Sequence, residues 1–265
     1  MFRSRLRLAS TAVDPIIAAL DEQRDELDGI LASLDDEDWA APTRCAGWSV
    51  ADVVLHLAQT SELAAVTGDP SFGERLRRFM LNDARTVDEG AERAVVAERG
   101  ANPAQLLRRW RDAEAAQRRH LRCHLAGSQP KRRLPWVVGE LSPRTLATTR
   151  LSEMWIHTAD IAEALGIELV PADRLWHIAR LAWRTLPYAF ARAGHVLHGP
   201  VALELTGPSG ATWSLGADDH PLTIVRGSGL EFCLVAARRL DPAETTLTTK
   251  GPDGSQVLAL VRTYA

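Results

Sequence analysis

The sequence has few cysteines, no long hydrophobic run and no excess of either charge, and each absence excludes a class of protein. Its three cysteines, Cys45, Cys123 and Cys233, lie far apart and form no CxxC pair, so we expect a reducing cytoplasm. No apolar run approaches the length of about 18 residues that a membrane span requires, and the first residues lack the apolar core of a signal peptide. A formal charge of −3, from 31 basic and 34 acidic residues, argues against nucleic acid or a membrane as a partner.

The remaining composition is that of an ordinary globular protein. The 265 residues are 46% hydrophobic and 25% charged, which suits one large domain or two smaller ones. Nothing in the composition indicates an oligomeric state.

The N-terminal part of the sequence carries helical patterns with recognisable start signals. Asp14 precedes Pro15, the residue favoured at the first helical position, and Ser49 with Asp52 predicts a capping box. The predicted helices cover residues 14–34, 49–68, 102–127 and 142–166. Four such helices predict a four-helix bundle, in which metal and cofactor sites lie between facing helices.

Between these helices the pattern weakens. Residues 35–48 are expected to form a loop, and apolar residues within 72–80 indicate a helix. The polar stretch 83–98 is interpreted as a long connection. A fifth helix, over 173–192, contains Pro187, which should end or kink it.

Beyond residue 199 the pattern changes to strands. VALELTG and ATWSLG predict a hairpin, LTIVRG and TTLTTKG predict further strands, and residues 229–240 and 255–265 are predicted to be helical. Helices followed by a mixed unit predict an α+β fold. We expect a helical, metal-binding domain over residues 1–170, a helical connector over 171–198 and a small α+β domain over 199–265.

The residues that point to chemistry are His56, Glu153 and His157. Glu153 and His157 lie four positions apart on a predicted helix, so both project from one face, and a bundle can bring His56 opposite them. Two imidazoles and one carboxylate form the ligand set of a catalytic zinc, and nickel, iron or cobalt would also fit. Asp160 is expected to orient an imidazole or to supply a fourth ligand.

The alternative interpretation is a surface charge pair or a hydrogen-bonded core histidine, because short motifs are unspecific. Met154, Trp155 and Ile156 separate Glu153 from His157 and indicate a buried helix. A carboxylate without a partner would be costly there, and a cation would remove that cost.

Two segments resemble the motifs of a known family. CAGWSVADVVLHLA, which contains His56, resembles the N-terminal motif of the mycothiol-dependent maleylpyruvate isomerase-like proteins of the DinB superfamily. RLSEMWIHTADIAEALG resembles that family's second metal motif. The resemblance covers residues 14–170. Residues 199–265 are more loosely similar to the family's sterol-carrier-like C-terminal domain. The segment EFCLVAARR resembles one found in a subgroup of metal-binding members whose substrate is unassigned.

The resemblance implies a DinB-like bundle in which His56, Glu153 and His157 bind a metal that activates mycothiol. The implied reaction is isomerisation of, or thiol transfer to, a small electrophile. Arginines would help to bind an acidic substrate, and Arg238 and Arg239 are the candidates for this catalytic role. A solvated helix end is the alternative for both arginines.

Other features and functions stay open. His120, Cys123 and His124 have the spacing of metal ligands, but they fit better at a helix C-terminus, where cations are favourable. A metal hydrolase or lyase that uses bound water without a thiol is a second possible function. A third is a non-catalytic protein that binds a small ligand and has a vestigial metal site.

Overall fold

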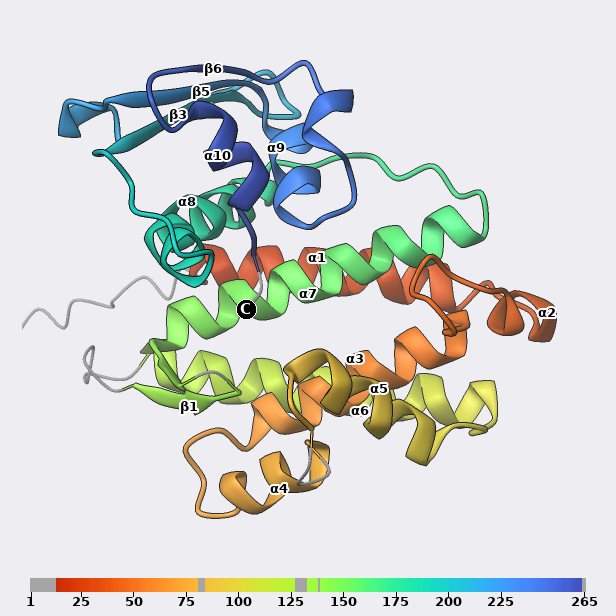
Figure 1. The fold of residues 1–265 in the computed structure, drawn as a ribbon. Coiled ribbons are helices and arrows are strands. Elements are labelled where there is room, and N and C mark those ends of the chain that lie inside the picture. Colours follow the sequence, from red (N-terminus) through yellow and green to blue (C-terminus); the bar gives the residue numbers. More distant parts are fainter. Residues whose placement is uncertain (1–12, 81–83, 127–132, 138, 264–265) are drawn as a thin grey trace, which may run out of the picture.

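The structure is a computed structural model that describes residues 13–80, 84–126, 133–137 and 139–263. It has an α+β fold in which a helical bundle is followed by a small mixed sheet (Figure 1). The predicted fold class is therefore confirmed. No helix within the described residues is long and apolar enough to cross a membrane.

Four long helices form the bundle, and their start signals act as the sequence predicts. The helices are α1 (Pro15–Leu31), α3 (Val50–Ala65), α6 (Pro103–Ala126) and α7 (Pro143–Ala164). Asp14 accepts a hydrogen bond from the Ile16 amide, and Ser49 forms the capping box with Asp52. Helix α7 contacts α1, α3 and α6 on one side and a further helix, α8 (Leu175–Arg192), on the other. The faces of α7 are therefore mostly buried, which matches its shortage of exposed charge.

Three short helices and a hairpin cover the bundle. They are α2 (Asp36–Ala40), α4 (Phe72–Phe79), α5 (Val87–Glu98), and strands β1 (Leu134–Trp136) and β2 (Gly139–Leu141). The prediction of an uninterrupted loop over residues 35–48 is wrong, because Asp35 caps α2 in a capping box with Asp38. The prediction of a connection over 83–98 is also wrong over Val87–Glu98, and residue 83 lies outside the described residues.

Helix α5 escapes prediction because its buried face is small. Gly90, Ala91, Ala94 and Val95 are its buried residues, so it lacks the large apolar side chains that make a helical period visible. A Cβ atom on Gly90 would lie 2.7 Å from the Met80 sulfur, so the helix packs closely at this point. The predicted end of the third helix at residue 127 lies outside the described residues.

The C-terminal unit is a four-stranded sheet covered by helices. Its elements are β3 (Val201–Thr206), β4 (Thr212–Leu215), β5 (Thr223–Ser228), α9 (Gly229–Ala236), β6 (Thr248–Lys250) and α10 (Gly254–Leu260). The strand order is β4-β3-β5-β6, with β3 and β5 parallel and the outer pairs antiparallel. Figure 1 shows α8, α9 and α10 between the sheet and the bundle. The predicted helix over 255–265 is shorter in the structure, because α10 ends at Leu260.

Helix α8 joins the two parts of the molecule. It continues through Pro187, so the expectation that this proline ends the helix is wrong. Its buried apolar face, which includes Leu186 and Phe190, packs into one hydrophobic cluster shared by α1, α7 and the sheet, and this packing outweighs the lost backbone hydrogen bond. The three-domain division remains a prediction.

Candidate functional site

A cavity of about 680 Å³ lies where the bundle meets the C-terminal unit. Residues of α3, α5, α7, α8, the β1–β2 hairpin and the C-terminal segment line it. Most of its wall is apolar and includes Trp48, Trp136 and Leu181, while His56, Glu153 and His157 form a polar region. A largely apolar cavity with a few convergent polar groups is typical of a small-molecule site.

The structure brings the three predicted side chains together. His56 Nε2 lies 2.7 Å from Glu153 Oε1, and His157 Nε2 lies 3.5 Å from the same oxygen. His56 comes from the middle of α3, and the other two lie one turn apart on α7, where a spacing of four residues aligns them. One donor atom from each residue lies within 4.8 Å of the others.

The charges of this group follow from its burial and hydrogen bonds. Burial would raise the pKa of Glu153, but hydrogen bonds from His157 and His56 outweigh it and hold the pKa well below its usual value. Burial lowers the pKa of His56 more than Glu153 raises it. Burial also opposes the charged form of His157, yet hydrogen bonds with Asp160, Cys45 and Glu153 raise its pKa well above the usual value. The group therefore attracts positive charge.

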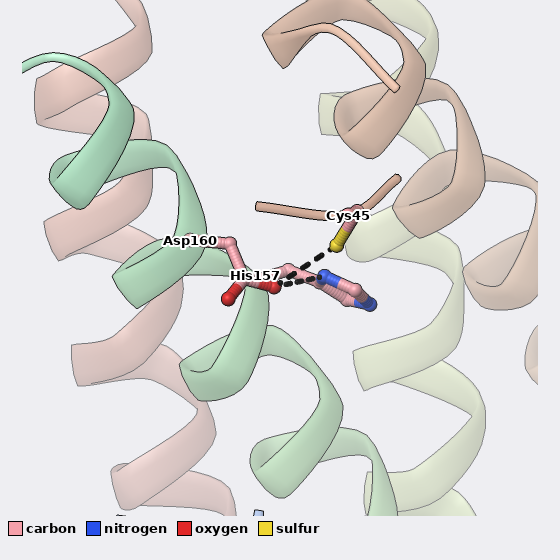
Figure 2. Close-up of side chains that lie close together, drawn as sticks. All are labelled: Cys45, His157 and Asp160. Atoms are coloured by element: carbon pink, nitrogen blue, oxygen red, sulfur yellow. Dashed lines mark hydrogen bonds and ion pairs between the residues drawn. The ribbon is translucent and has the colours of Figure 1, made fainter. Parts of the chain in front are cut away.

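Asp160 connects this group to the C-terminal unit. Its Oδ2 atom lies 3.0 Å from His157 Nδ1, and Arg239 donates to both carboxylate oxygens at 2.7 Å. Burial would raise the pKa of Asp160, but His157 and Arg239 lower it to about 2. Figure 2 shows Cys45 and His157 meeting at the same carboxylate, to which the Cys45 thiol donates at 3.3 Å.

These residues fit a divalent cation. The ring nitrogen of His157 that faces away from Glu153 is held by Asp160, which is the usual arrangement for a metal-binding histidine. His56 Nδ1 is buried and has no hydrogen-bond partner among the described residues, so Nε2 is the atom through which His56 acts in the group. In the described part of the chain, a second group that could hold a metal consists of Cys45, His157 and Asp160. Arg239 already neutralises Asp160 there, so the His56 group suits a cation better.

The other sequence candidates lie elsewhere. The rings of His120 and His124 are 4.3 Å apart near the end of α6, and neither joins Cys123 in a group of metal ligands among the described residues. Arg238 follows α9 with a φ of 59° and does not line the cavity, whereas Arg239 does. Asp52 completes the capping box of α3 with Ser49, as the sequence predicts, and also pairs with Arg99.

Sequence reasoning missed Arg150, which is only 3% exposed and reaches the cavity wall from α7. Its guanidinium donates to Gln117 and Thr60, and it lies 5.9 Å from the centre of the Trp136 ring. Burial lowers the pKa of Arg150. Its position three residues before Glu153 was the available signal, because that spacing places both side chains on one helical face.

Comparison with known proteins gives consistent matches. The family model of the mycothiol maleylpyruvate isomerase N-terminal domain matches residues 20–162. Uncharacterized proteins of two Mycobacterium tuberculosis strains are each 34% identical over 255 residues, covering 95% of both chains. The crystal structure of a mycothiol-dependent maleylpyruvate isomerase is similar with a TM-score of 0.58 and 16% identity, over 90% of this chain and 94% of that one. A histidine-to-alanine mutant of that isomerase matches over the same shares with 16% identity and a TM-score of 0.57. The structural matches establish the fold.

Proposed function

Because this chain belongs to the mycothiol maleylpyruvate isomerase N-terminal domain family, we propose that it is a metal-dependent enzyme that uses mycothiol. It isomerises a small electrophilic substrate or transfers the thiol to it. The observation that carries the proposal is the convergence of His56, Glu153 and His157 in the cavity wall. The site works in the cytoplasm, within a metal-binding bundle over residues 1–170 that a connector over 171–198 links to the domain over 199–265.

His56, Glu153 and His157 hold the metal, with zinc as the first choice and nickel, iron or cobalt as others. When bound, a divalent cation would favour the thiolate form of a coordinating thiol, which is the nucleophilic form. Asp160 fixes the orientation of the His157 ring through Nδ1, and Arg239 fixes Asp160 in turn. Arg239 is thus a positioning residue, and Arg238, outside the cavity wall, is not proposed for the site.

Arg150 binds an acidic group of the substrate. It carries a positive charge at the cavity wall, and its hydrogen-bond partners Gln117, Thr60 and Ser61 are neutral. A carboxylate there would offset the cost of its burial. Maleylpyruvate, which the solved relative isomerises, is an acid of this kind.

The apolar wall around this charge excludes water from the reacting carbon atoms. A thiolate that adds to an activated double bond allows rotation about the resulting single bond. Loss of the thiol then gives the isomer, and retention gives the conjugate.

The test combines metal analysis with a rate assay. We expect a stoichiometric divalent metal that is lost in His56→Ala, and turnover of maleylpyruvate with mycothiol but neither with glutathione nor without a thiol. The matched control is Arg226→Ala, because Arg226 lies in an exposed pair with Glu204 on the sheet. Equal rates under all three conditions would favour a hydrolase or lyase, and wild-type protein without metal would favour a binding protein.

A further inference from the structure

The cavity extends well beyond the His56 group. Its lining residues on α7 run from Thr145 to His157. At a rise of about 1.5 Å per residue these positions span about 18 Å of the helix axis, and the His56 group occupies only the end at Glu153 and His157. Helix α8 packs against α7, and Figure 1 shows it beside the half in which α7 begins. A ligand that fills the cavity would therefore reach from the His56 group toward α8.

The segment after α10, residues 261–263, forms part of the cavity wall beside α8. Figure 1 shows the chain descending from α10 toward α7. The Thr185 hydroxyl on α8 donates to the Arg262 carbonyl at 3.1 Å, and the Thr263 amide donates to the Ala236 carbonyl at 3.2 Å. Val261 is fully buried. These contacts fix the backbone around Arg262, which is half-buried and lines the cavity.

The arginines of the cavity wall differ in the partners that they already have. Arg239 pairs with Asp160, and Arg150 donates to neutral side chains. Within the described residues, the Arg262 side chain makes one long hydrogen bond, from Nε to the Leu260 carbonyl at 3.5 Å, and no ion pair. Both Nη atoms of Arg262 are therefore available to a ligand in the cavity.

Thr263 provides a second observation at the same place. This residue is only 7% exposed and lines the cavity, and its buried hydroxyl has no hydrogen-bond partner among the residues that the structure describes. A buried polar group without a partner is costly, and an acceptor group on a ligand would remove that cost. A carboxylate offers acceptor oxygens of the kind that guanidinium and hydroxyl groups bind.

We propose that Arg262 is a specificity-determining residue that binds a second acidic group of the substrate, remote from the His56 group. This inference rests on the proposed function, in which Arg150 binds the first acidic group. The two arginines come from α7 and from the segment after α10, so a substrate with one carboxylate engages one of them and leaves the other without a charged partner. The cavity therefore selects an elongated substrate with an acidic group at each end over one with a single acidic group.

Binding of unreactive acids to the full chain tests this assignment without turnover. Calorimetry compares adipate, which has a carboxylate at each end, with hexanoate, which has one carboxylate on a chain of the same length. We expect the wild type to bind adipate at least about tenfold more tightly, because a hydrogen bond to a charged group contributes about that much or more. Arg262→Gln should lower this affinity ratio to about two, the statistical advantage of two equivalent ends.

Two further variants separate charge from folding. Arg262→Lys keeps the charge and should retain part of the preference for adipate. Arg192→Gln is the matched control, because Arg192 is exposed at the end of α8 and does not line the cavity, and it should keep the wild-type ratio. An unchanged ratio in Arg262→Gln, or an equal fall in Arg192→Gln, would overturn the proposal.

Steady-state kinetics gives a second reading. Maleylpyruvate also has a carboxylate at each end, so Arg262→Gln should raise its KM about tenfold, with kcat within about threefold and the KM for mycothiol within about twofold of wild type. A rise confined to the KM for mycothiol would overturn the proposal, because Arg262 would then bind the thiol. A wild-type protein without thiol-dependent turnover would overturn the proposed function instead, and the ratio of adipate to hexanoate affinity would still decide whether Arg262 binds an acidic group.

Discussion

Two glutamates in one bundle, one fully buried and one in the cavity wall, have opposite electrostatic characters. Glu114 on α6 is fully buried, and its carboxylate accepts hydrogen bonds from Ser61 and Gln117, which are neutral donors. Burial raises its pKa, and these partners and nearby arginines only partly oppose that rise. Glu153 on α7 meets two imidazoles instead, and its pKa is well below the usual value.

The difference separates a structural carboxyl group from a cation site. At Glu114, burial outweighs the hydrogen bond from Ser61 and the charges of nearby arginines, so its surroundings favour the neutral form. The surroundings of Glu153 require positive charge, which His157 supplies as a proton and a divalent cation can supply as well. Burial alone would not have distinguished the two, because it pushes both pKa values in the same direction.

Removal of the Glu153 charge tests the cation site most directly. Glu153→Gln should lower both metal affinity and the thiol-dependent rate by more than about 100-fold, since even the loss of an outer partner of a metal ligand costs up to about that much. Metal content after dialysis and kcat/KM with mycothiol measure the two effects.

Glu114→Gln is the matched control for Glu153→Gln, because it makes the same chemical change at the other glutamate. We expect full metal content and a rate within about threefold of wild type, since the side-chain hydrogen bonds of Glu114 within the described residues go to Ser61 and Gln117 and not to the His56 group. Loss of metal in Glu114→Gln as well would mean that the two carboxyl groups act as one network.

Asp160→Asn should lower the free energy of unfolding by a moderate amount. The side chain of Asp160 is fully buried, and a pKa lowered from 3.8 to about 2 corresponds to about 2 kcal/mol of unfolding free energy. Because the folded pKa is depressed, this contribution is present above pH 3.8 and is lost as the pH falls toward 2. Urea unfolding of metal-free protein should show the difference at pH 7 and a smaller one at pH 3.

The control for Asp160→Asn is Arg226→Ala, which breaks an exposed ion pair with Glu204. Exposed ion pairs of this kind contribute less than about 1 kcal/mol to the free energy of unfolding. Equal destabilisation by both variants would show that the Asp160 pairs contribute no more than a surface ion pair.

Much of the bundle could be predicted because its helices begin with strong local signals. Asp14, Ser49 and Ser142 each accept a hydrogen bond from a first-turn amide. Helix α5 could not be predicted because small residues form its buried face. Helix α8 was predicted, but its continuation through Pro187 was not, because tertiary packing outweighs the effect of the proline. These outcomes depend on neighbours that are distant in the sequence.

In the candidate site, too, some features follow from local sequence patterns and others depend on tertiary packing. The alignment of Glu153 with His157 follows from helical periodicity, and the motifs pointed to His56. The pairing of Arg239 with Asp160 joins residues 79 positions apart and requires the C-terminal unit to pack against α7. The spacing of Arg150 from Glu153 placed both on one helical face, but its hydrogen-bond partners lie on α3 and α6, so its position at the cavity depends on how these helices pack.

The two glutamates should also differ, by a smaller amount, in how they make stability depend on pH. The folded-state pKa of Glu114 lies above its unfolded value of 4.5, so its stabilising contribution is complete below pH 4.5 and declines as the pH rises toward the folded-state value. Glu114→Gln cannot lose a proton, and its amide should cost about 1 kcal/mol at pH 4 through an imperfect hydrogen bond. Its unfolding free energy should therefore gain on that of the wild type as the pH rises above 4.5. The pKa of Glu153 is depressed, so its contribution is complete above pH 4.5, and Glu153→Gln in metal-free protein should show a constant deficit there that shrinks only as the pH falls below 4.5. Urea unfolding of the three proteins from pH 3 to pH 8 measures both trends. Parallel trends would mean that the pKa values of the two carboxyl groups are shifted in the same direction, and the distinction between the structural glutamate and the one at the cation site would not hold.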